Sequence, residues 1–189
     1  MKESVKTICV ILVLAALFTT GCATVPKNEG ERQVLKAKVD SAITEFKERD
    51  PGIQRFFNES YGYAVYPRVA KGAFWLGGAR GKGIVYEQGS LIGYSTLNQA
   101  TIGFSFGGEF FREIIFFQNK QDLDDFTIAN GEYTFSAQAT ALALRSGVAR
   151  KATYQNGMAV FIIAEKGLMV DASVGGQKFT YVPVSKIRD

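Results

Sequence analysis

The sequence predicts an α+β fold in which N-terminal amphipathic helices pack on a glycine-rich, mainly antiparallel β-barrel or sandwich. Apolar residues first recur at helical spacing, between residues 35 and 46, and the period changes to the alternation of strands from residue 61 onward. The chain also holds 20 glycines and 13% aromatic residues, which favours closely packed strands over a helical bundle. Glycine-containing turns separate the later apolar segments, and strands at such regular spacing are typical of a barrel or sandwich.

Composition and charge limit the kind of function. A length of 189 residues suits one domain after a leader, since about 150 residues is a usual domain size. Histidine is absent, which removes the usual general base and the commonest metal ligand, and two cysteines cannot form a metal-binding thiol cluster. The formal net charge is +4, too small an excess to indicate a nucleic-acid partner. We therefore expect a protein that is not an enzyme and that uses no cofactor or metal.

The first 22 residues predict an export signal that ends in a cysteine. Two lysines precede an apolar run over residues 8–18, and this run is too short to span a bilayer. Thr19, Thr20, Gly21 and Cys22 resemble the lipobox of bacterial lipoproteins, whose cysteine carries the acyl chains, although leucine is usual where Thr19 stands. Ordinary signal-peptide cleavage is the alternative. Because Ala23 follows the cysteine, the resemblance implies an outer-membrane lipoprotein that faces the periplasm.

The chain is expected to divide into a signal peptide at residues 1–21, a polar tether at 22–30 and a single domain at 31–189. An amphipathic helix opens the domain, and charged residues of both signs occupy its polar faces. We interpret it as a helix packed on the body. A membrane-surface helix is the alternative, although such a helix usually has a basic excess. The apolar positions are Leu35, Val39, Ala42, Ile43 and Phe46.

A second short helix and the first strands follow this amphipathic helix. Asp50 and Pro51 form a favourable helix start, an N-cap aspartate with proline at the first helical position. The period then changes, which predicts one strand through Tyr63 and Val65 that is bounded by Pro67, and another over residues 73–76. The sheet is therefore expected to begin near residue 61.

Residues 71–86, KGAFWLGGARGKGIVY, combine closely spaced glycines with several cations and the only tryptophan. Neither the P-loop spacing nor G-x-G-x-x-G fits this stretch, so it does not predict nucleotide binding. We interpret it as a glycine-rich hairpin whose tight turn carries Arg80 and Lys82. These cations are either a solvated loop or a small cradle for a lipid phosphate, with Lys71 as a third cation and Trp75 at the depth of the membrane interface.

The rest of the chain predicts further strands. Residues 91–106 form a strand pair or one long bent strand, and residues 107–108 permit a bend or bulge. Residues 114–117 form an apolar run suited to burial on both faces. Later strands are expected over residues 134–141, 158–164, 168–173 and 178–182.

One helical turn interrupts these strands, over residues 121–126. Asn119 is expected to cap it, while Leu123 and Phe126 dock inward. The aspartates at 122, 124 and 125 lack the glycine and the glutamate of a calcium-binding loop, so we interpret them as a solvated helix.

Several ordered blocks carry a family resemblance. They are YGYAVYP (61–67), KGAFWLGGARGKGIVY (71–86), IGFSFGGE (102–109), IIFF (114–117) and KGLMVDASVGGQKF (166–179). Together they resemble the SYLF domain in its bacterial lipoprotein form, over about residues 33–183. The resemblance implies a lipid-binding module, with phosphoinositide-type lipids as ligands of eukaryotic members and actin as a partner of some fungal ones. Two positions depart from the family pattern, because Glu109 stands where glutamine is frequent and Trp75 where a small residue is common.

The function expected from the sequence is a phospholipid-binding lipoprotein of the bacterial envelope, anchored through Cys22. Its contact residues would be Lys71, Arg80, Lys82 and Trp75, directed to anionic head groups at the periplasmic face of the outer membrane. The alternative is an envelope structural or protein-interaction module without a lipid ligand, whose partner the sequence does not name. A hydrolase is disfavoured because histidine and a nucleophile elbow are both absent.

Overall fold

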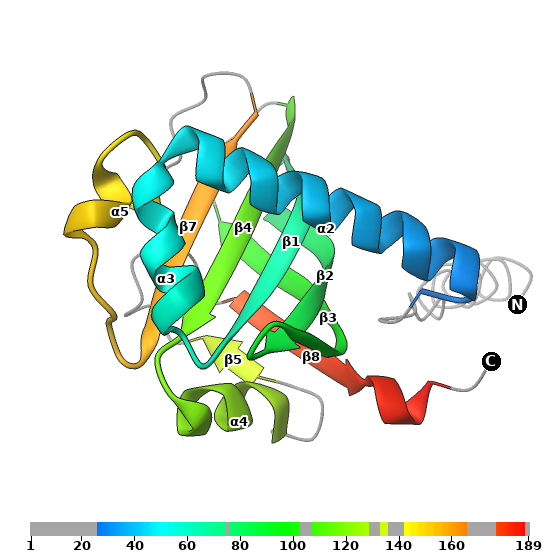
Figure 1. Ribbon diagram of the computed structural model, residues 1–189. Helices are drawn as coiled ribbons and strands as arrows, with labels where there is room; N and C mark the ends of the chain where they lie inside the picture. Colours follow the sequence, from blue (N-terminus) through cyan, green and yellow to red (C-terminus); the bar gives the residue numbers. More distant parts are fainter. Residues whose placement is uncertain are drawn as a thin grey trace, which may run out of the picture.

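A computed structural model describes residues 26–74, 76–102, 107–128, 133–135, 142–165 and 177–187. It contains helices at the N-terminal end of the domain and one large sheet (Figure 1). The helical elements are α2 (Glu29–Arg49), the 3₁₀ turn η1 (Pro51–Ile53), α3 (Gln54–Glu59), α4 (Lys120–Ile128), α5 (Val148–Lys151) and the 3₁₀ turn η2 (Val184–Lys186). The strands are β1 (Gly62–Phe74), β2 (Leu76–Glu87), β3 (Ser90–Ile102), β4 (Gly107–Phe117), β5 (Tyr133–Phe135), β6 (Leu142–Ala143), β7 (Met158–Ala164) and β8 (Gln177–Pro183).

The sheet has eight described strands in the order β5-β8-β3-β2-β1-β4-β7-β6. All neighbouring pairs are antiparallel except β6 and β7, which are parallel. The order is linear, with β5 and β6 at its two ends, so the described strands form an open sheet rather than a closed barrel. The α+β fold class that the sequence predicts is confirmed.

A layer of helices covers one face of the sheet. α2 lies across the strands, with α3 and α5 beside its C-terminal end (Figure 1). Its apolar stripe is buried as predicted, and these side chains share a core with Val65, Ile84 and Ile114 of the central strands. α2 begins within the segment predicted to be a tether, because the Asn28 side chain caps it by accepting a hydrogen bond from the Glu31 amide. The buried residues of α2 are Leu35, Val39, Ala42 and Phe46.

Asp50 connects the helices of this layer. It follows α2 directly, and its carboxylate accepts hydrogen bonds from the Gly52 amide at 3.0 Å and from the Ala149 amide, at the start of α5, at 2.8 Å. The predicted helix start at Asp50 and Pro51 is confirmed, and the same carboxylate also fixes α5, which lies about a hundred residues later in the chain.

The opposite face of the sheet encloses a second core. Tyr66 of β1 contacts Phe179 of β8 with ring centroids 5.6 Å apart, and Phe126 of α4 contacts the same phenylalanine at 5.3 Å. Three strands separate β8 from β4 in the sheet, yet the Gln177 side chain of β8 bonds Glu113 of β4. The sheet therefore curls strongly, so that distant strands meet through its inner face.

The structure corrects three predictions about β1 and β2. Pro67 does not bound a strand. It lies inside β1, where the register with both neighbours shifts between residues 65 and 69, and such a bulge accommodates a residue without an amide hydrogen. The second correction concerns Arg80 and Lys82, which lie within the continuous strand β2 and not in a tight turn. Phe74 of β1 pairs with Leu76 of β2, so the hairpin reverses inside the segment expected to be a strand over residues 73–76, and that prediction is wrong.

The strands and the helical turn predicted after residue 90 agree with the structure in most of the described residues. The sequence left open whether residues 91–106 form a pair of strands or one long strand. The described part of this segment forms the single strand β3. The buried run at 114–117, the capped turn at 121–126 and the strands at 158–164 and 178–182 are confirmed. The strand expected at 134–141 overlaps β5, while residues 136–141 and the strand expected at 168–173 lie outside the described residues.

Candidate functional site

The cations and the glycines of β2 lie on opposite faces of the strand. Ile84 and Tyr86 belong to the core beneath the helices, so Arg80 and Lys82, at alternate positions of the same strand, lie on that helical face as well. Gly81 and Gly83 therefore face the inner core. The glycine-rich pattern thus serves one face of a strand, and the cations occupy the other face.

The inner-face glycines allow the two strands to approach closely. A Cβ atom placed on Gly83 would lie 2.5 Å from the Val65 carbonyl oxygen, and one on Gly81 would lie 2.8 Å from Val69 Cγ2. Real side chains essentially never reach such distances, so only glycine fits at both positions. These glycines therefore have an architectural role.

On the helical face, the first turns of α2 and the outer side of β1 and β2 enclose a groove of about 610 Å³. Three cations line it, Lys38 from α2, Arg68 from β1 and Lys82 from β2. Its apolar wall includes Val34, a side chain that is 55% exposed. The complete lining is Pro26, Asn28, Gly30, Glu31, Val34, Leu35, Lys38, Pro67, Arg68 and Lys82, which we call the α2 groove.

The α2 groove has an excess of positive charge. Glu31 is the single acidic residue in its lining, and one of its carboxylate oxygens accepts a hydrogen bond from the Lys27 amide at 2.9 Å. The Arg68 guanidinium lies over the Phe110 ring, 3.8 Å from the centroid, so its position on the strand is fixed by an aromatic partner. A cationic groove with an apolar wall can accept a group that is anionic at one end and apolar at the other.

The structure brings together only part of the residue set predicted from the sequence. Lys82 lies in the α2 groove, and Arg80 lies exposed on the same face of β2, outside the groove lining. Lys71 pairs in register with Ala79, a residue of the inner core, so it lies on the opposite face of the sheet from both of them. Trp75 and Cys22 lie outside the described residues.

Sequence reasoning missed two cations of the groove, Lys38 and Arg68. Both are separated from Lys82 along the chain, and only the packing of α2 over β1 and β2 brings the three together. A weak signal existed for Arg68, since a cation directly after a proline inside a strand pattern indicates an irregular, outward-facing position. Lys38 has no signal that distinguishes it from the other lysines of α2.

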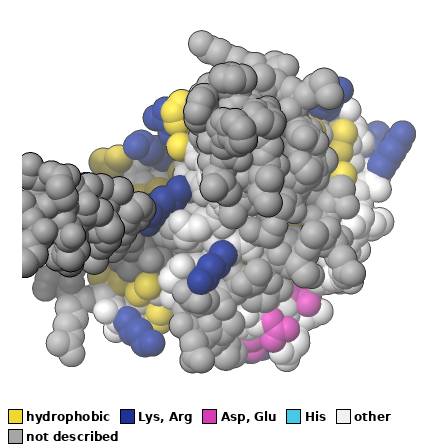
Figure 2. Space-filling view, turned by 180° about the vertical axis from the view of Figure 1, so that it is seen from behind, with side chains coloured by type: hydrophobic (Ala, Val, Ile, Leu, Met, Phe, Trp, Pro, Cys, Tyr) yellow, Lys and Arg dark blue, Asp and Glu magenta, His cyan; other side chains and the backbone are white. Residues whose placement is uncertain are grey.

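Figure 2 shows the face opposite α2. Lysine and arginine side chains appear at separate places in this view, and a few acidic side chains lie close together (Figure 2). The α2 groove combines three of the described cations with apolar surface.

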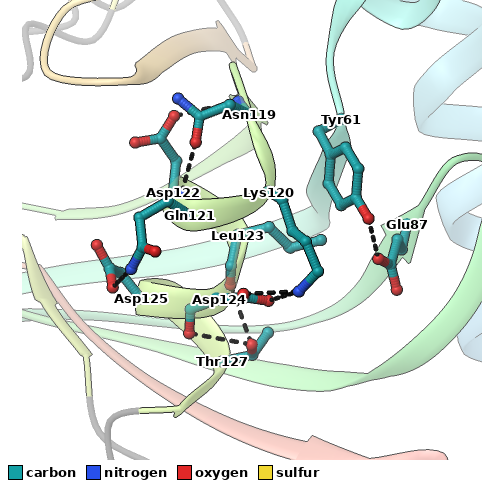
Figure 3. Close-up of polar contacts among 10 residues, drawn as sticks. All are labelled: Tyr61, Glu87, Asn119, Lys120, Gln121, Asp122, Leu123, Asp124, Asp125 and Thr127. Atoms are coloured by element: carbon teal, nitrogen blue, oxygen red, sulfur yellow. Dashed lines mark hydrogen bonds and ion pairs between the residues drawn. The ribbon is translucent and has the colours of Figure 1, made fainter.

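Neither a membrane-spanning helix nor a metal-type cluster of side chains occurs among the described residues. None of the described helices is both long and apolar enough to cross a membrane. Within the same described residues, no three histidine, cysteine or acidic side chains are grouped as a metal site would require. The aspartates of α4 instead make local contacts, since Asp122 accepts from the Asn119 amide at 3.1 Å and Asp124 binds Lys120 at 2.7 Å (Figure 3).

Comparison with known proteins gives one informative relative. No family model matches the chain. The chain is 28% identical over 156 residues to a protein of Aeromonas veronii called Beta cell expansion factor A. The match covers 82% of this chain but 59% of the relative, so the chain spans well under two thirds of that protein. The chain is therefore a homologue of Beta cell expansion factor A over 82% of its length.

Proposed function

We propose that this chain is a phospholipid-binding lipoprotein of the bacterial cell envelope, without enzymatic activity, that is anchored through Cys22 and receives anionic head groups in the α2 groove. The observation that carries the proposal is the meeting of Lys38, Arg68 and Lys82 beside the exposed Val34. A phospholipid head group offers a phosphate to the cations, while the first carbons of its acyl chains would contact the apolar wall. The resemblance of the chain to SYLF domains, which bind lipids, supports the same assignment.

The position of the α2 groove supports the proposed anchor. Pro26 belongs to the groove lining and follows Cys22 by four residues, a length of chain that spans at most about 14 Å. If Cys22 is acylated, the groove is held within that distance of the membrane surface. Such tethering raises the effective concentration of head groups at the groove, so the groove would be occupied at the membrane even if its affinity for a free head group is weak.

Binding to vesicles tests this function. Protein that begins at residue 23 should sediment with vesicles of phosphatidylglycerol and phosphatidylcholine, and less so as salt rises, because the contacts are electrostatic. Each cation near an anionic surface contributes about 1 kcal/mol, so the triple change Lys38→Ala, Arg68→Ala and Lys82→Ala should weaken binding on the order of 100-fold. Arg80→Ala tests whether the neighbouring cation on the same face adds to this effect.

A matched control removes the same charge elsewhere. Arg145, Lys151 and Lys186 are exposed and lie outside the groove lining, so their triple replacement by alanine should leave most of the binding intact. Equal loss in both triple variants would show that net charge alone, and not the groove, decides binding. Absence of vesicle binding by the unmodified protein would refute the proposal and favour a protein-interaction module of the envelope.

A further inference from the structure

A second cavity lies at the other end of α2. It has a volume of about 730 Å³ and is formed where the ends of several elements converge. Lys47 near the C-terminus of α2, the last residues of α3, the start of β1, the β2–β3 turn and the β4–α4 junction all contribute to it. We call this cavity the polar cleft. None of its lining residues belongs to the α2 groove, so the two cavities are separate sites.

One wall of the polar cleft is aromatic. Phe57, Tyr61 and Tyr63 line it, and the rings of Phe57 and Tyr63 meet edge to face at 78° with centroids 5.2 Å apart. Tyr63 also stacks on Tyr86 of the neighbouring strand at 4.9 Å, which fixes the orientation of its ring. The cleft therefore presents rigid aromatic surface and not mobile aliphatic side chains.

The other walls carry neutral polar groups. Four carboxamide side chains line the cleft, from Asn58, Gln88, Gln118 and Asn119. Gln88 and Gln118 offer both donors and an acceptor, whereas the oxygens of Asn58 and Asn119 already accept from the Gln54 side chain and the Asp122 amide. The hydroxyl oxygen of Ser60, which also lines the cleft, is shielded from solvent and has no hydrogen-bond partner within the described part of the chain.

The charges of the cleft are largely neutralised. The Lys120 ammonium is held by Asp124 at 2.7 Å, and the Tyr61 hydroxyl donates to Glu87 at 2.7 Å, both visible in Figure 3. The Lys47 ammonium lies over the Phe57 ring at 4.6 Å, and Glu59 balances its charge in the lining. A ligand that carries a net charge would gain little here, whereas a neutral ligand with many hydroxyl groups would find both donors and acceptors.

The backbone at the edge of the cleft is also unusual. Gln88 has φ of +47°, a left-handed conformation that a glutamine adopts rarely, and glycine follows it in the same turn. Positive φ at both residues is what a two-residue hairpin turn between β2 and β3 requires. The turn places both Gln88 and Gly89 in the lining of the cleft.

We propose that the polar cleft binds a neutral pyranose sugar, either free or as a unit of a glycan chain. The apolar C–H face of the ring would lie against the aromatic wall, and its hydroxyl groups would pair with the carboxamides of Gln88 and Gln118. This combination of an aromatic face with neutral donors and acceptors matches the amphipathic surface of a pyranose.

Calorimetric titration of the full-length protein, in a non-ionic detergent without a sugar head group, tests the proposal. The probes are methyl β-D-glucopyranoside, chitotetraose as a glycan chain, and glucose 6-phosphate as a charged comparison. At least one neutral probe should bind with a Kd of about 1 mM. Gln88→Ala and Gln118→Ala should each weaken this binding about fivefold, since each removes one or two hydrogen bonds of ordinary strength.

Gln155→Ala is the matched control, because Gln155 is exposed and lies outside the cleft lining. Binding of the glucoside supports the proposal with a free sugar as ligand, and binding of chitotetraose alone supports it with a glycan chain. No binding of either neutral probe at about 20 mM overturns it, whether or not glucose 6-phosphate binds. Equal affinity of the Gln88→Ala, Gln118→Ala and Gln155→Ala variants also overturns it. Vesicle binding depends on the α2 groove and is unaffected by either result.

Discussion

Gln177 donates a hydrogen bond of 3.0 Å to Glu113 through the inner core, between two strands that three others separate in the sheet. Both residues are almost completely buried, and Glu113 Oε1 has no partner within the described residues. Burial raises the pKa of Glu113 to about 7, although the amide donor of Gln177 partly opposes the shift. The bond therefore connects β8 to β4 across the curled sheet through a carboxyl group that is about half protonated near pH 7.

Stability should fall as the pH rises through the titration of Glu113. The native pKa is above the ordinary value of 4.5, so the native protein binds more protons than the unfolded chain between pH 4.5 and about 7. The free energy of unfolding should decrease over this window by about 3 kcal/mol and level off above it. In Glu113→Gln this decrease should disappear, so the variant becomes the more stable protein at about pH 8. Urea denaturation across this pH range measures both profiles. An unchanged slope in the variant would assign the pH dependence to another group.

Gly83→Ala should destabilise the protein, because the new methyl group meets the Val65 carbonyl oxygen and the Tyr66 ring at 2.5 and 2.6 Å. The backbone oxygen cannot move without disturbing the pairing of β1 and β2, so we expect a loss of about 2–3 kcal/mol. Gly78→Ala on the same strand is the control. Its nearest contact would be 3.5 Å, and the change should be neutral or slightly stabilising. Thermal unfolding measures both, and similar melting temperatures would show that the close approach has no cost.

Two buried tyrosines should respond in opposite ways to replacement by phenylalanine. The Tyr66 hydroxyl donates to Ser95 Oγ at 2.8 Å in the inner core, so Tyr66→Phe leaves a buried hydroxyl with one partner fewer and should cost about 1–2 kcal/mol. The Tyr86 hydroxyl is buried without a partner within the described residues, so Tyr86→Phe should be neutral or stabilising. Chemical denaturation of both variants tests this contrast, which would be contradicted if Tyr86→Phe were the more damaging change.

Asp50→Ala should cost about 2–3 kcal/mol, because it removes the acceptor of the Gly52 and Ala149 amides at once. Burial opposes ionisation of Asp50, but the backbone hydrogen bonds outweigh it and lower the pKa of the carboxyl group. Its stabilising effect is therefore present above the ordinary pKa of 3.8 and is lost as the pH falls below it. Denaturation at neutral and acid pH should show the difference between native and variant protein shrinking in acid. Asp125→Ala, at an exposed position of α4, is the control and should have little effect.

The elements that periodicity determines could be predicted from the sequence. The apolar stripe of α2 and the buried run in β4 follow from local spacing, and so does the capped start of α4, where the Asn119 side chain accepts from the Asp122 amide. The position of Pro67 could not be predicted, because a bulge in the middle of a strand depends on both neighbouring strands.

The candidate site was harder to predict than the fold. Glycines at every second position of β2, such as Gly81 and Gly83, resemble the glycines of a turn, although they serve a crowded strand face. Because of this similarity, Arg80 and Lys82 were predicted to lie in a turn, whereas they lie in the strand β2. Local spacing also cannot show that a lysine of α2 and an arginine of β1 share one groove, because the docking of the helix decides it.

The position of β8 in the chain determines the order in which the strands of the sheet can pair during folding. β1, β2 and β3 follow one another and pair with short connections, so they can assemble early. β8 pairs with β3 only after some eighty further residues, and it brings Phe179 and Gln177 to the inner core. During synthesis, the inner face of the early strands and the edge of β3 therefore stay uncovered until β8 has been made. This interval is when the protein is most exposed to aggregation and most dependent on chaperones.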